Sequence, residues 1–130
     1  MPIVNLTPHV LTLRPAFGQD LKIYPDDIVA RVSTAPGSKL CDLALGADPG
    51  DERTIAIYRA STLGAVEGLP AAKVETVYLV SAVVAAALVG QGRVDVFVPG
   101  TGPQDGAVRF REGPHQGQIE AVTRLVQAPQ

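Results

Sequence analysis

Apolar and polar residues alternate in short runs along most of the chain, and this pattern predicts a protein built mainly of β-strands. Runs of strand length, rich in Val, Ile, Leu and Tyr, occupy residues 2–6, 9–14, 27–33, 54–61, 75–81 and 93–100. Residues 34–53 interrupt the pattern because they are rich in Gly, Pro, Asp and Ser. We expect a long loop there, with one helical turn around KLCDLAL, and loops of this length are often functional.

A second pattern covers the middle of the chain, where the Ala-rich segment SAVVAAALVGQG separates two apolar strands. Ser81 is suited to cap a helix, and Gly90 or Gly92 is suited to end it. The order predicts a βαβ unit in which residues 78–81 and 94–98 lie parallel in one sheet. A competing interpretation is a strand that continues through VYLVSAVVAA, because the valines in it are poor helix formers.

At the C-terminal end, two alternating runs flank a turn that contains Gly and Pro, which predicts a β-hairpin from residues 107–111 and 119–126. The fold class is therefore α/β of the mixed α+β type. We expect a single small globular domain spanning residues 1–130, with a mixed β-sheet, one βαβ unit and the C-terminal β-hairpin.

One short helix leaves part of the sheet uncovered, which favours a homo-oligomer, a dimer or a higher assembly. We expect the C-terminal hairpin at the interface, because Val122 and Leu125 would otherwise lie on an open edge.

Composition narrows the class of protein. The chain has 130 residues, of which 46% are hydrophobic, and a formal net charge of −2. These values predict a globular domain that needs no metal or cofactor to fold, and they argue against extended nucleic-acid binding. The longest apolar stretch falls short of the roughly 20 residues that span a bilayer. With a lone Cys41 and no secretory signal pattern, we expect a cytoplasmic protein with no membrane contact.

The carboxyl ends of the two parallel strands are the first candidate site, since ligands collect at such edges. Ser81 follows one strand, and Gly100, Thr101 and Gly102 follow the other. Main-chain N–H groups of this Gly-Thr-Gly segment and the two hydroxyls could bind an anion, with Arg31 or Arg109 supplying charge. The alternative is purely structural, a helix cap and a turn.

The N-terminal stretch NLTPH is the second candidate. Pro8 fixes the backbone before His9, and Asn5 and Thr7 can bond the local main chain, so the ring would be held in one orientation. His9 could then contact a ligand or act as a general acid or base. The same residues equally suit a structural turn, and the sequence leaves both interpretations open.

Four segments, NLTPHVLTL, GLPAAKVETVYLVSAVVAAAL, DVFVPGTGP and AVRFREG with GQIEAV, occur in this order. Together they resemble a group of small uncharacterised proteins encoded by tailed bacteriophages and some bacteria. The resemblance implies an accessory factor that acts on the host cell, a class that includes proteins that bind or degrade nucleotide signals of antiviral defence.

Three functional hypotheses follow. The leading one is a non-enzymatic protein that sequesters a nucleotide or another phosphate-bearing derivative, with Asn5 and His9 at the base or sugar. The second is a phosphodiesterase-like enzyme with His9 as acid or base. The third is a factor that docks on a host protein.

Overall fold

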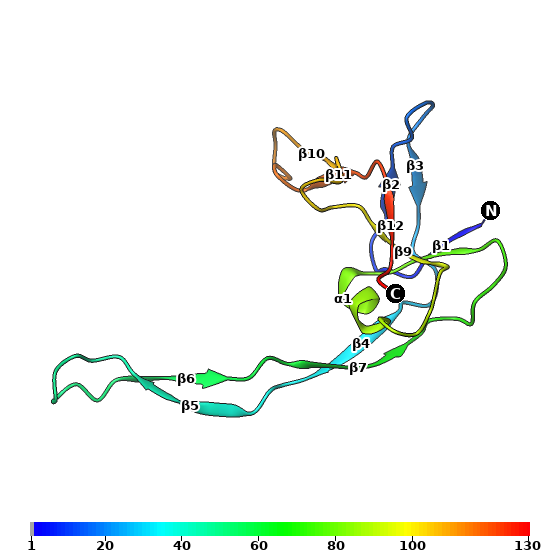
Figure 1. Ribbon diagram of the computed structural model, residues 1–130. Coiled ribbons are helices and arrows are strands. Elements are labelled where there is room, and N and C mark those ends of the chain that lie inside the picture. The colour runs from blue at the N-terminus through cyan, green and yellow to red at the C-terminus, as the bar shows by residue number, and fades with distance from the viewer. Residues whose placement is uncertain (1) are drawn as a thin grey trace. The chain divides into compact units, whose positions relative to one another are not determined.

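A computed structural model describes residues 2–130, which divide into two compact units (Figure 1). The first unit runs up to Val32 and resumes from Val66 to Gln130, and the second comprises Ser33–Ala65. Strands dominate both units, and a single short helix is present among the described residues, so the chain is mixed α+β with little helix. That residues 1–130 fold as one domain stays a prediction.

A four-stranded mixed sheet with the order β1-β8-β9-β12 organises the first unit. Strand β1 (Ile3–Asn5) lies parallel to β8 (Val77–Leu79), and β8 lies parallel to β9 (Val96–Pro99). Strand β12 (Leu125–Gln127) runs antiparallel to β9. The parallel β8–β9 pair confirms the predicted βαβ unit, and its two strands are the central ones of the sheet.

Helix α1 (Ala82–Ala87) connects β8 and β9. The Ser81 hydroxyl caps it by accepting a 3.4 Å hydrogen bond from the main-chain N–H of Val84. The helix confirms the predicted element, and the alternative of a continuous strand is wrong. Alanine gives the segment its helix propensity, and burial of Val84 and Leu88 offsets the poorer propensity of valine.

The hydrophobic core of this unit forms where α1 packs over the sheet. Its buried members come from β8 and the residue after it, β9, the inner side of the helix and its C-cap, the residue before β4, and the segments that follow β1 and β12. They are Leu6, Ala30, Tyr78, Val80, Val84, Ala85, Leu88, Val96 and Ala128.

Two β-hairpins complete the first unit. Strand β2 (Leu11–Leu13) pairs antiparallel with β3 (Leu21–Ile23), an element that the sequence pattern did not predict. Strand β10 (Val108–Arg109) pairs antiparallel with β11 (Ile119–Ala121), which confirms the C-terminal hairpin in part, since the predicted second strand over residues 119–126 ends at Ala121 and Leu125 and Val126 lie in β12.

The expected role of Val122 at an open edge is wrong. Its side chain is only 3% exposed, and its main chain bonds to β2 on both sides, donating to the Thr12 carbonyl and accepting from the Arg14 N–H. Leu125 is half-buried in β12, where it pairs with Pro99. Both residues are thus used within the unit.

The second unit is a β-hairpin in which β5 (Lys39–Ala44) pairs antiparallel with β6 (Thr54–Tyr58). Strand β4 (Arg31–Ala35) precedes it and pairs with β7 (Thr62–Glu67), which follows it. The prediction of a loop over residues 34–53 with a helical turn at KLCDLAL is therefore wrong. Alternating apolar side chains of β5 match Ile55 and Ile57 of β6, and this long-range pairing overrides the local signals.

No helix within residues 2–130 is long and apolar enough to cross a membrane.

Candidate functional site

A pocket of about 510 Å³ opens in the first unit between the segment after β1, the start of β4 and the start of α1. Its volume lies within the range of small-molecule sites, roughly 300–1,000 Å³. Most of its walls are aliphatic. The lining consists of Thr7, Pro8, His9, Leu11, Val29, Ala30, Arg31, Val32, Val80, Ser81, Val83, Val84 and Pro99.

The turn NLTPH forms one wall, and Asn5 holds it together. The Asn5 carboxamide oxygen accepts from the Thr7 N–H at 3.0 Å and from the Thr7 hydroxyl at 2.6 Å. Its amide group donates to the carbonyls of His9 at 2.7 Å and Ile23 at 3.0 Å. Asn5 is 1% exposed and has its full hydrogen-bonding capacity used, so its side chain builds the turn and does not line the pocket.

Thr7 also serves this turn. It lies in the pocket wall, but it is 6% exposed and its hydroxyl is bound to Asn5. The polar residues of the turn therefore replace the main-chain partners that β1 loses where it ends, as the structural interpretation expected.

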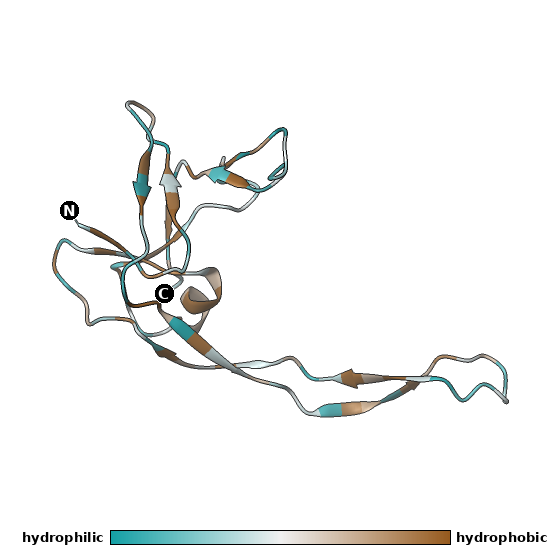
Figure 2. Cartoon of the chain, turned by 180° about the vertical axis from the view of Figure 1, so that it is seen from behind, coloured by the Kyte–Doolittle hydropathy of each residue, from teal (hydrophilic) through white to brown (hydrophobic). Residues whose placement is uncertain are grey.

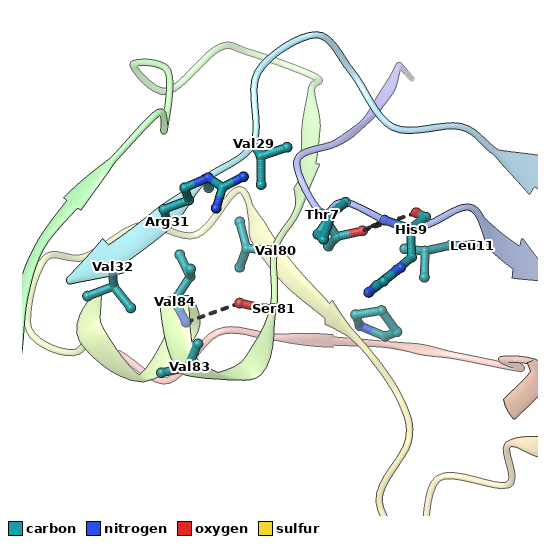
Figure 3. A pocket seen from close by; sticks show the side chains of 13 residues that line it. Thr7, His9, Leu11, Val29, Arg31, Val32, Val80, Ser81, Val83 and Val84 are labelled. Atoms are coloured by element: carbon teal, nitrogen blue, oxygen red, sulfur yellow. Dashed lines mark hydrogen bonds between the residues drawn. The ribbon is translucent and has the colours of Figure 1, made fainter. Parts of the chain in front are cut away.

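His9 differs from its two neighbours because it is exposed and lines the pocket. Its carbonyl is fixed by Asn5, and Figure 3 shows its ring turned toward the side of the pocket where Ser81 lies. The turn thus presents one side chain, the imidazole, which can donate to or accept from a ligand.

Arg31 supplies the charge. It is the first residue of β4, and its guanidinium extends from that strand toward the turn that carries Thr7 (Figure 3). The ion pairs found among residues 2–130 involve other cations, and none of the described lining residues is acidic. The pocket therefore carries an unneutralised cation beside apolar walls.

A second pocket of about 440 Å³ has a mixed lining that contains two cations, Lys73 and Arg93, and two acids, Glu75 and Asp95. Arg93 makes a bidentate pair with Asp95, with nitrogen–oxygen distances of 2.9 and 3.0 Å, and also donates to the Pro70 carbonyl. The hydrogen bond from Arg93 lowers the pKa of Asp95, so the carboxylate stays charged and neutralises the arginine. With two carboxylates in its lining, the second pocket suits an anion less well than the pocket with Arg31, whose lining contains none.

The predicted Gly-Thr-Gly segment lies outside the pocket, which it reaches only through the preceding Pro99. The Gly100 N–H already donates to the Arg124 carbonyl at 2.9 Å. The Gly102 N–H donates to a carboxylate oxygen of Asp105, also at 2.9 Å. Thr101 is exposed in the same turn. The Asp105 carboxylate thus accepts the N–H group to which an anionic ligand was expected to bind.

The predicted site residues therefore separate into those that line the pocket and those that do not. Thr7, His9, Arg31 and Ser81 come together around one pocket, although Ser81 also caps α1. Arg109 lies apart in β10, where it donates to the Gly117 carbonyl at 2.8 Å.

Sequence reasoning missed the aliphatic walls on either side of Arg31. Val29 and Val32 come from the run of residues 27–33, in which the lone arginine among apolar residues was the available signal. Within residues 2–130, no group of three His, Cys, Asp or Glu side chains is placed to hold a metal ion.

No family model, curated protein or solved structure compared with the chain matches it, so the candidate site rests on the chain's own residues and geometry.

Proposed function

We propose that the protein binds a small phosphate-bearing nucleotide in the pocket between His9, Arg31 and Ser81, without converting it. The observation that carries the proposal is the pairing of one unneutralised guanidinium with aliphatic walls and no acidic lining residue. A nucleotide has the matching combination of an anionic group and a flat base, whose faces are apolar and whose edge carries hydrogen-bonding groups.

Each part of the pocket has a distinct role in this proposal. Arg31 binds phosphate oxygens, for which the forked donors of guanidinium are well suited. His9 and the Ser81 hydroxyl add hydrogen bonds to phosphate, sugar or base. The base packs between the valines of the wall, and a volume of about 510 Å³ admits a ligand of this size.

The resemblance of the sequence to small bacteriophage proteins supports a specific setting. In that setting the ligand is a nucleotide signal of host defence, and the protein acts by sequestering it. Sequestration needs affinity and no chemical step, which agrees with a pocket whose contacts are a cation, a ring and a hydroxyl.

Isothermal titration calorimetry against a panel of mono-, di- and cyclic nucleotides tests the proposal. We expect at least one nucleotide to bind the wild type, and the Arg31→Ala variant to bind it roughly 10- to 100-fold more weakly, as expected for loss of a charged hydrogen bond. Arg109→Ala is the matched control, because it removes an arginine outside the pocket and should leave affinity unchanged. Absent heat for the whole panel, or equal losses in both variants, would remove the proposal.

Recovery of the bound nucleotide distinguishes binding from catalysis. After prolonged incubation with the wild-type protein, we expect chromatography to return the nucleotide intact. A cleaved product that disappears with His9→Ala would replace the proposal with the catalytic alternative, in which His9 acts as general acid or base.

A further inference from the structure

The β5–β6 hairpin of the second unit is amphipathic. Its pairing places Cys41 opposite Ile57 and Leu43 opposite Ile55, and Leu45 continues the same side by alternation. We call these five residues the apolar stripe. Leu43, Leu45 and Ile55 are each about half exposed, with values of 49%, 54% and 53%.

The other side of the hairpin is small or polar apart from Tyr58, which lies opposite Lys39 and is 60% exposed, while Leu40 occupies the bulge between Lys39 and Cys41. This side carries Asp42 opposite Ala56 and Ala44 opposite Thr54, and Lys39 forms an ion pair with Asp42 at 2.9 Å. Figure 2 shows hydrophobic colour along parts of β5 and β6. Because four aliphatic side chains and Cys41 gather on one side, whereas Asp42, Thr54 and the Tyr58 hydroxyl lie on the other, the stripe is the side that gains most from being covered.

Nothing within the second unit covers the stripe. None of the described residues between Ser33 and Ala65 is buried, so this unit has no core of its own. A two-stranded hairpin is marginally stable in water, and it needs further strands or a packing partner. The stripe therefore requires an occupant.

The uncharged stripe and the charges at the two ends of the hairpin indicate which partner covers the stripe. The stripe contains no charged residue, so a second copy of it can pack on it without repulsion. The hairpin tip, residues 46–53, contains Asp48, Asp51, Glu52 and Arg53 and is net acidic, whereas Arg59 at the other end of β6 is basic. Asp51 is paired with Arg53, but Asp48, Glu52 and Arg59 form no ion pair among residues 2–130.

An antiparallel arrangement brings the acidic tip of one hairpin to the basic end of the other, whereas a parallel one would place two acidic tips together. An anionic membrane would also repel the tip, since surface-binding segments need cations beside their apolar face. A second copy of this chain fits better than a lipid surface.

We propose that Ser33–Ala65 is an oligomerisation hairpin, in which the apolar stripes of two copies pack face to face and antiparallel about a two-fold axis. The pair forms two layers of two strands and buries both stripes, as a symmetric interface requires. This inference does not depend on the proposed nucleotide site.

Sedimentation velocity of the full chain at 1–100 µM tests the proposal. We expect a dimer or a higher even-numbered assembly for the wild type. Leu43→Asp, which places a charge in the stripe, should weaken self-association by roughly 30-fold or more, as at an interface hot spot. Thr54→Asp is the matched control, because it places the same charge on the other side of the hairpin opposite the uncharged Ala44, and it should self-associate normally. A monomeric wild type, or an undiminished assembly in Leu43→Asp, would overturn the proposal and leave the stripe to another protein.

Cross-linking keeps the test valid if both variants disturb the hairpin itself. Cys41 lies in the stripe and is the sole cysteine of the chain. In an antiparallel pair, Cys41 of one hairpin lies toward the tip end of the other, so a short bis-maleimide should join Cys41 to the cysteine of a Gly50→Cys partner and should join the Cys41 residues of two wild-type copies poorly. In a Cys41→Ser background, Gly50→Cys puts a cysteine at the tip, where a side chain meets open space, and tips of antiparallel hairpins should not be joined. Efficient tip-to-tip linkage or efficient Cys41-to-Cys41 linkage would contradict the antiparallel arrangement.

Discussion

Replacement of Asn5 by alanine tests the hydrogen-bonded turn that forms one wall of the pocket. The substitution removes the acceptor of the Thr7 N–H and the donors to the carbonyls of His9 and Ile23. It also removes the shorter of the two contacts of the Thr7 hydroxyl, which keeps the His9 carbonyl at 3.2 Å. Asn5 is 1% exposed, so water cannot fully take over these bonds without reorganisation of the turn.

The magnitude follows from the number of main-chain groups that lose a partner. At roughly 1 kcal/mol for each of three groups, Asn5→Ala should lower the free energy of unfolding by about 3 kcal/mol. For a chain of this size, that loss corresponds to a fall in Tm of about 10 °C. It is a large part of a typical domain stability of about 5–15 kcal/mol.

Urea denaturation followed by far-UV circular dichroism measures the effect. Gln116→Ala is the control, because Gln116 is exposed in the C-terminal hairpin and should change stability by less than about 0.5 kcal/mol. If Asn5→Ala loses less than about 1 kcal/mol relative to this control, the turn does not depend on the Asn5 side chain.

The Arg93–Asp95 pair and Gly68 provide two further predictions. Because Arg93 lowers the folded-state pKa of Asp95, the pair's stabilisation is complete above the unfolded value of about 3.9 and is lost as pH falls through the folded value. Asp95→Asn should therefore lower the free energy of unfolding by about 2 kcal/mol at pH 7. Urea titrations should show that this difference from the wild type becomes smaller toward pH 3. A difference that does not change with pH would refute the linkage. Gly68 has a φ of +80°, and an added Cβ would lie 2.5 Å from the Val29 carbonyl oxygen. Gly68→Ala should lose roughly 2 kcal/mol or more of stability in thermal melts. Gly113→Ala is the control, because Gly113 also has a positive φ but an added Cβ there meets open space, and it should lose about 1 kcal/mol. Equal losses in the two variants would contradict the clash.

The central βαβ unit could be predicted because its signals are local. Ser81, the alanine run and the glycines after it mark a helix, and the apolar strands on both sides mark buried positions. Hairpin β10–β11 could also be predicted, because its turn contains Gly and Pro between two alternating runs.

Strand β5 could not be predicted because its neighbourhood is dominated by turn formers. The Gly, Pro and Asp residues that suggested a long loop belong to the ends of the hairpin, and the strand is defined by pairing with β6 ten or more residues away. Pairings of β1 with β8 and of β2 with β3 likewise depend on contacts that no local window contains.

Part of the candidate site could be predicted from the sequence. Polar residues of the NLTPH turn and Arg31 stood out, but their convergence needs the start of β4 to lie beside α1. The anion-binding interpretation of Gly100–Gly102 overlooked a nearby signal. Asp105 follows three residues after Gly102, a spacing that allows a carboxylate to accept the N–H of the turn.

The most direct test of the nucleotide proposal is a two-dimensional ¹H–¹⁵N NMR titration of the chain with ADP, with adenosine as the matched ligand that lacks phosphate. We predict that ADP shifts the Arg31 side-chain Nε–H resonance and the main-chain resonances of His9 and Ser81, while adenosine leaves Arg31 nearly unchanged. Absence of shifts at millimolar ADP, or shifts confined to Arg109 and the C-terminal hairpin, would contradict the assignment of this pocket as the nucleotide site.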